Sequence, residues 1–183
     1  SEFSNCRNMV QYTIKAHIIP YSNKLRKNMA LFLSTTINKI DSKARVSVPS
    51  TFRTALIKQS FKGIIAFPSY SSKCIDSCGI DRMEAIAESL DQNEGYSKDE
   101  YDLMSLYFGE AEKLPFDQEG RVILPKNLIQ HSDIKDQVLF VGLGPTFQIW
   151  EPNTYNEQKL KTIKNAKDKN LNPRLKPIPR GIR

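Results

Sequence analysis

Hydrophobic and polar residues alternate in the same way in two separate parts of the chain. A β-prone run at residues 31–40 leads into residues 41–49 (DSKARVSVP), and a shorter run at 113–116 leads into residues 117–125 (DQEGRVILP). The second nine-residue segment follows the first by 76 positions and keeps its Asp, Arg, Val and Pro. A fixed internal repeat is typical of a duplicated fold element. We therefore expect two copies of one unit.

Each copy predicts a strand, a tight turn and a second strand. Asp41 and Asp117 are suited to turns because their carboxylates accept backbone hydrogen bonds, and alternation resumes after Arg45 and Arg121. The proline that ends each segment cannot donate to a strand ladder but suits the first turn of a helix. We expect a short helix there, with Phe52 or Leu128 as its apolar anchor.

Further strands are predicted after each short helix. Residues 63–67 and 137–141 are apolar runs, and the second is followed by a glycine turn and the return strand 147–150. The equivalent return in the first copy, near residues 72–77, is less apolar. A single four-stranded unit of this size buries too little surface to be stable, so the two copies should pack together or interleave.

Two amphipathic helices are predicted between the copies. Asp81 with Glu84, and Ser97 with Glu100, have the spacing of capping boxes, and Gly109 is suited to end the second helix. These helices carry many acidic residues, but the preferred interpretation is packing and subunit contact.

The distribution of charge changes this picture more than its sum does. The net charge is +7, yet the 25 residues from 159 hold nine Lys or Arg and one Asp, and residues 1–28 add five basic residues against one acid. The remaining body has 13 basic and 18 acidic residues, a net charge of −5. Within it, residues 39–62 hold six basic residues and one acid, whereas residues 113–136 hold four of each. The first copy is therefore expected to contact a polyanion and the second to support it.

Other chemistry is weakly represented. Cys74 and Cys78 have no second Cys or His pair at zinc-binding spacing, and His131 has no evident nucleophile beside it. No phosphate-binding glycine loop or nucleophile elbow is present. We expect no enzyme activity, no cofactor and no metal. A small hydrolase that uses the acidic helices is the weakest alternative. No apolar run is long enough to cross a bilayer, so no membrane partner is expected.

The repeated Asp-x-x-x-Arg, the segment FGEAE at 108–112 and VG at 141–142 followed by FQIW at 147–150 together resemble the MraZ family. The resemblance covers about residues 29–158 in the expected order. It implies an α+β, mainly β fold of two swapped-hairpin modules of the AbrB/SpoVT kind, with flanking and connecting helices. It also implies a ring-shaped homo-oligomer, an octamer or dodecamer.

The resemblance further implies a transcriptional regulator, with repression as the expected sign. The implied target is the bacterial division and cell-wall gene cluster, read through short G-rich direct repeats of double-stranded DNA in its own promoter. Location in the cytoplasm and nucleoid would follow. An antitoxin-type protein that binds DNA and a toxin is the alternative, because related swapped-hairpin folds pair with toxins.

Carried onto this chain, the resemblance places DNA binding on Arg45 and Lys43. Arg45 would reach a guanine edge, and Lys43 or Arg53 would hold phosphates, with Lys39 in the same basic stretch. The alternative for Arg45 is a salt bridge to Asp41 that only shapes the turn. We expect weaker contacts or a structural role from Arg121, Asp41 and Asp117. The family normally has Gly before the first arginine, whereas this chain has Ala44, which costs about 1 kcal/mol if the turn needs a positive φ.

These patterns divide the chain into five parts. They are an N-terminal extension (1–28), a first module (29–79), connecting helices (80–109), a second module (110–152) and a basic C-terminal helix and tail (153–183). The native start is expected at Met29, because Met29 directly precedes the first predicted strand and Ser1 to Phe3 resemble a vector-derived extension. Residues 1–28 lack the pattern of a signal peptide and are expected to be disordered or non-native. The basic tail either adds non-specific attraction to phosphates or is a solvated end.

Overall fold

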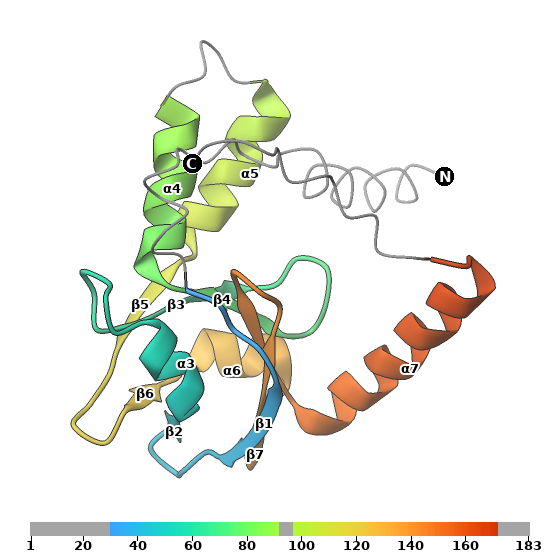
Figure 1. The fold of residues 1–183 in the computed structure, drawn as a ribbon, viewed down its shortest axis with the longest axis horizontal. Helices are drawn as coiled ribbons and strands as arrows, with labels where there is room; N and C mark the ends of the chain where they lie inside the picture. The colour runs from blue at the N-terminus through green and yellow to red at the C-terminus, as the bar shows by residue number, and fades with distance from the viewer. Residues whose placement is uncertain (1–29, 92–96, 172–183) are drawn as a thin grey trace, which may run out of the picture.

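Two sets of four strands, each with one short helix, form most of the body (Figure 1). The computed structural model describes residues 30–91 and 97–171, so the predictions for residues 1–29 and for the end of the tail lie outside the described residues. The first set is β1 (Thr35–Lys39), β2 (Arg45–Ser47), α3 (Ser50–Ala55), β3 (Gly63–Pro68) and β4 (Ile75–Cys78). The second is β5 (Glu112–Pro115), β6 (Arg121–Ile123), α6 (Lys126–Ser132), β7 (Gln137–Gly142) and β8 (Phe147–Trp150). Between them lie α4 (Ile80–Asp91) and α5 (Lys98–Gly109), and α7 (Pro152–Asp168) follows β8.

The two copies interleave, as the small size of each unit predicts. One antiparallel sheet has the strand order β1-β7-β8-β4-β3-β5, so the first strand of each copy pairs with the third strand of the other copy. The second strands, β2 and β6, form a separate two-stranded antiparallel ribbon. The chain is therefore an α+β, mainly β protein in which the copies complete each other's strand pairing.

The core lies between the sheet and the two short helices. Phe52 of α3 and Leu128 of α6 are fully buried, as their place three residues after the prolines predicts. Phe52 packs edge-on against Phe32 and Phe140, with ring centroids 5.2 and 6.3 Å apart. Both copies contribute to this cluster, which explains why their strands need not close separately.

Two boundaries differ from the prediction. The strand expected at 31–40 is shortened to β1, because Ser34 has a φ of 79° and breaks the extended backbone, while Phe32 forms an isolated bridge to Gly144. The capping box expected at Asp81 is also wrong, since α4 begins at Ile80 and Asp81 lies inside its first turn. The capping box at Ser97 is confirmed, with both reciprocal hydrogen bonds to Glu100 present.

The connecting helices α4 and α5 pack on one face of the sheet (Figure 1). Met83 of α4 is buried in a cluster with Ile65 and Phe67 of β3, and the Tyr107 ring of α5 lies 5.2 Å from that of Phe67. Packing against β3 thus accounts for part of the apolar surface of these helices, and no residue of α5 is fully buried. Within the described residues, no helix is long and apolar enough to span a membrane.

The equivalent positions Ala44 and Gly120 both adopt left-handed backbone, with φ of 59° and 74°. Ala44, which stands where the family normally has Gly, therefore does need a positive φ, and the cost of about 1 kcal/mol expected in that case applies. The carbonyl oxygen at each position accepts a hydrogen bond from the other copy, that of Ala44 from the amide of Leu124 and that of Gly120 from the amide of Val48. Those two hydrogen bonds hold the β2–β6 ribbon in register.

Ala44→Gly is expected to raise the free energy of unfolding by about 0.5–1 kcal/mol, because relief of the left-handed strain outweighs the added freedom of the unfolded chain. Gly120→Ala should lower it by a similar or larger amount, since a Cβ there would lie 2.4 Å from Nη1 of Arg53 in addition to the strained φ. Urea denaturation measures the free energy of unfolding of both variants against that of the wild type. An unchanged or lower midpoint for Ala44→Gly would contradict the expectation.

Candidate nucleic-acid interface

The turn of the first copy is built around the carboxylate of Asp41. Its Oδ1 accepts hydrogen bonds from the backbone amides of Lys43 and Arg45, both at 2.9 Å. Its Oδ2 lies 2.7 Å from both Nε and Nη2 of Arg45. The side chain of Arg45 is about one-third exposed, at 34%. The salt bridge between Arg45 and Asp41, which is the alternative role expected for Arg45, is therefore present in this structure.

The turn of the second copy repeats this geometry. Asp117 Oδ1 accepts from the amides of Glu119 and Arg121, both at 2.9 Å, and Asp117 Oδ2 lies 2.7 Å from Arg121 Nε. Arg121 has an additional acidic partner, because its Nη1 lies 2.9 Å from Glu119 Oε2. The position equivalent to Glu119 is Lys43, so one turn adds a positive charge where the other adds a negative one.

These contacts lower the pKa of both aspartates. The side-chain hydrogen bond from Arg45 lowers the pKa of Asp41 from 3.8 to about 2, with help from the backbone amides. For Asp117 the backbone hydrogen bond of Arg121 is the largest cause and its side chain the second. Each carboxylate therefore stabilises its turn only while it is ionised.

Stability is expected to fall as the pH drops from about 4 to about 2. The folded pKa of Asp41 lies below its unfolded value, so the contribution is complete above the unfolded value and is lost as protons bind. Asp41→Asn keeps an acceptor oxygen but cannot titrate, so its thermal unfolding temperature should depend less on pH across this window. Parallel curves for the two proteins would rule out this turn as a source of the acid sensitivity.

The β2–β6 ribbon brings the two turns into one structural element. Arg45 lies opposite Ile123, and Ser47 lies opposite Arg121. All four side chains are exposed or half-buried, whereas the intervening Val46 and Val122 are almost fully buried, at 0% and 1%. The outer face of the ribbon therefore presents two arginines, one from each copy, on neighbouring strands.

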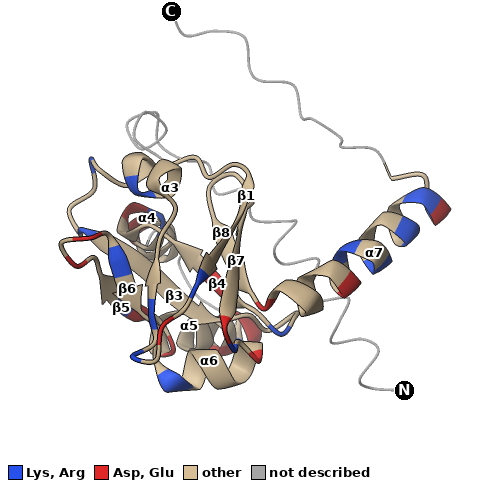
Figure 2. Ribbon diagram, turned by 90° about the horizontal axis from the view of Figure 1, so that it is seen from below, with Lys and Arg blue, Asp and Glu red and all other residues tan. Residues whose placement is uncertain are grey.

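The remaining candidates lie in different places. Lys39 ends β1 and Lys43 lies at the tip of the first turn, and both are exposed. Arg53 lies instead at the second turn, because its guanidinium covers Gly120 and its Nε donates to the carbonyl of Val48 at 3.1 Å. Figure 2 shows acidic and basic segments next to each other at the turn that leads into β6.

The sequence did not reveal how the candidates group. Strand pairing between copies puts Arg121 on the same ribbon as Arg45, although the charge count separated them. It also moves Arg53 from the first turn to the second. Ser47 and Ile123, which complete the outer face of the ribbon, carried no signal of their own beyond their alternation with the buried valines.

The described cysteines, Cys74 and Cys78, and the described histidine, His131, do not form a reactive site. Burial raises the pKa of the Cys74 thiol, and it raises that of Cys78 to about 12, so both remain protonated thiols near neutral pH. Nε2 of His131 lies 3.0 Å from the carbonyl oxygen of Ser69. In the described part of the chain, no group of three or more His, Cys, Asp or Glu side chains is placed to hold a metal ion.

Comparison with known proteins identifies related chains. Residues 107–174 match a family model described as "MraZ protein, putative antitoxin-like". A protein named Transcriptional regulator MraZ from Rickettsia bellii (strain OSU 85-389) is 45% identical over 144 residues, which cover 78% of this chain and 96% of the relative. Its namesake from Rickettsia canadensis (strain McKiel) is 41% identical over 143 residues, with the same coverage of both chains. Another from Rickettsia akari (strain Hartford) is 42% identical over 134 residues, 73% of this chain and 89% of the relative.

Proposed function

Because the chain belongs to the MraZ family, whose relatives are named transcriptional regulators, we propose that it binds double-stranded DNA in a sequence-specific manner. The target is the promoter of the division and cell-wall gene cluster, with short G-rich direct repeats as the operator and repression as the outcome. The protein acts in the cytoplasm on the nucleoid, and it is not an enzyme.

The β2–β6 ribbon is the observation that carries this proposal. The major groove of B-DNA admits a two-stranded β-ribbon, and arginine is the side chain best suited to pair with both acceptors of a guanine edge. Arg45 stands on the outer face of the ribbon with a lysine beside it in the turn. The ribbon thus supplies both the shape and the chemistry that a G-rich repeat requires.

The ion pair with Asp41 is compatible with this role. The pair is exposed, and exposed ion pairs contribute little to stability, so Arg45 can exchange the carboxylate for a guanine at small cost. Asp41 itself shapes the turn, because a carboxylate facing phosphate is repelled.

The other candidate side chains position the protein on DNA. Exposed Lys39 and Lys43 flank the first turn and are suited to phosphate contacts, which add affinity without sequence information. Arg53 and Arg121 lie at the second turn, where Asp117 and Glu119 offset their charge. We assign Arg121 a weaker contact and Arg53 a phosphate contact made from its place over Gly120.

A ring of several copies would let successive ribbons engage successive repeats. Linked sites gain avidity without new contacts, and a closed homo-oligomer, an octamer or dodecamer, presents them at regular spacing. Titration of a labelled duplex carrying the direct repeats, against a scrambled duplex of equal length at two salt concentrations, tests the proposal. Equal affinity for both duplexes would overturn it.

The antitoxin-type alternative has one specific observation in its favour, the antitoxin-like description of the matching family model. Its partner-binding segment would be the basic end of the chain from residue 159. Antitoxin chains of this fold usually carry one hairpin module, whereas this chain has two interleaved copies. If this chain is an antitoxin, removal of its residues 159–183 should abolish toxin binding and leave DNA binding in place.

A further inference from the structure

Within the described residues, the side-chain contacts that tie helix α7 to the sheet lie at its start. The side chain of Glu151 accepts a hydrogen bond from the amide of Thr154 at 2.8 Å, and the Tyr155 ring lies 5.6 Å from that of Trp150. No residue of the helix is buried. Figures 1 and 2 both show the helix projecting away from the sheet. Most of the stability of helices in proteins comes from packing of an apolar face, so a surface that covers α7 would stabilise it.

The exposed part of α7 carries an apolar pair within a basic surface. Leu160 and Ile163 are three residues apart, on one side of the helix, and are 69% and 42% exposed. Over its 17 residues α7 holds four lysines against two acids, a net charge of +2; the lysines are Lys159, Lys161, Lys164 and Lys167. A fitting surface would therefore be an apolar groove with acidic surroundings.

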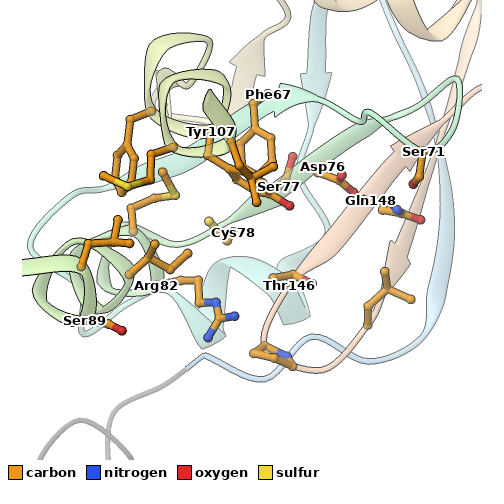
Figure 3. Close-up of a pocket in the computed structure, with 18 of the residues that line it drawn as sticks. Phe67, Ser71, Asp76, Ser77, Cys78, Arg82, Ser89, Tyr107, Thr146 and Gln148 are labelled. Atoms are coloured by element: carbon orange, nitrogen blue, oxygen red, sulfur yellow. Dashed lines mark hydrogen bonds between the residues drawn. The ribbon is translucent and has the colours of Figure 1, made fainter. Parts of the chain in front are cut away.

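Such a groove lies between α4, α5 and the sheet and is called here the interhelical groove. It encloses about 490 Å³, and its helical walls are mostly apolar, formed by Ile86, Leu90, Leu103, Met104, Tyr107 and Phe108. Figure 3 shows Tyr107 and Phe67 on one side of it and Arg82 and Ser89 on the other. The methionine side chain can adapt to an inserted aliphatic residue.

The charges of the two surfaces are complementary. Helices α4 and α5 together hold seven acidic and two basic residues, a net charge of −5, against +2 for α7. Complementary charge of this kind favours association and fixes its direction. In both views α7 lies apart from the α4–α5 pair of its own chain, so a neighbouring copy is the available source of a helix for the groove.

We propose that α7 of one copy docks its Leu160 and Ile163 in the interhelical groove of the next copy, which makes a head-to-tail contact. Head-to-tail contacts close into rings when the rotation permits, so this contact would build the oligomer and leave the β2–β6 ribbons outside it. The inference rests on the oligomer in the proposed function. The family-model match extends to residue 174 and so includes all of α7, which supports a structural role for this helix within the family.

Two complementary variants test the contact by multi-angle light scattering. The helix variant carries Leu160→Asp with Ile163→Asp, and the groove variant carries Met104→Asp. Each alone should fall from the wild-type mass to a monomer. Ile57→Asp, which changes a 75% exposed apolar residue beyond the end of α3, is the matched control and should keep the wild-type mass.

Mixing the variants gives the decisive result. Only the helix of the groove variant and the groove of the helix variant are intact, so a mixture should form a complex of two subunits and stop there. Wild-type mass for either variant alone, or a mixture that stays monomeric, would overturn the proposal. Circular dichroism checks folding, and Met104→Trp, which fills the groove without adding charge, replaces Met104→Asp if that variant unfolds.

Failure of this contact is distinguishable from failure of the proposed function. If the helix variant keeps the mass of the wild-type oligomer, the proposed α7 contact is wrong and the DNA-binding proposal is unaffected. If the two variants dissociate as expected but the wild-type oligomer does not bind the operator, the result supports the contact and refutes the DNA-binding proposal. A wild-type monomer would remove the contact and the ring together.

Discussion

Arg45→Ala is expected to abolish operator binding while leaving the mass of the oligomer unchanged. A bidentate contact between arginine and guanine contributes about 1–3 kcal/mol of discrimination, and an oligomer on tandem repeats would lose that contact at every engaged site. The loss at the operator should therefore be at least about 30-fold, even if each of two engaged sites loses only the lower figure. Electrophoretic mobility shift with the repeat-bearing duplex measures it.

Two control variants separate recognition of bases from attraction to phosphates. Arg121→Ala should weaken binding less, because Asp117 and Glu119 already offset its charge. Lys43→Ala should weaken operator and scrambled duplexes alike and reduce the slope of log affinity against log salt by about 1. Normal operator binding by Arg45→Ala would refute the assignment of Arg45 and leave it as the turn-shaping partner of Asp41.

Cutting the operator to a single repeat is expected to reduce the affinity by a factor of about 10²–10⁴. Each ribbon makes a small set of contacts, so tight binding requires several copies of the protein to engage at once. Fluorescence anisotropy with duplexes of one, two and three repeats, all of equal length, measures the dependence. Equal affinity for one and several repeats would mean that a single ribbon is sufficient and that the ring adds nothing to binding.

Local structure in this chain follows closely from local sequence. The prolines at 49 and 125 precede short helices, Phe52 and Leu128 are buried where their spacing places them, and Ser97 caps α5. Each feature depends on residues a few positions apart. The duplication itself was visible because the nine-residue segments keep the residues that the turn and the following helix require.

Pairing between distant segments could not be predicted in the same way. Nothing in the residues of β1 specifies β7 as its neighbour, because any strand of matching alternation satisfies the same backbone donors and acceptors. The consequence for the site is large. Interleaving creates the β2–β6 ribbon, brings Arg121 onto the face that carries Arg45 and places Arg53 over Gly120.

The backbone strain at Ala44, by contrast, was predicted from the sequence for the case in which the turn needs a positive φ. Ala44 stands where the resembling family has Gly, and the structure gives it a φ of 59°. The strain is tolerated because the turn is fixed from several sides, by the carboxylate of Asp41 and by the hydrogen bond from Leu124 to the Ala44 carbonyl. Arg45 therefore leaves the turn with the same geometry as Arg121.

The most direct test is light scattering of the full chain with and without a promoter fragment that contains the tandem repeats. We expect a closed oligomer of the 20.9 kDa chain that forms a discrete complex with this fragment and none with a scrambled fragment of equal length. A monomer whose mass is the same with and without the fragment would contradict both the ring and its role in reading DNA.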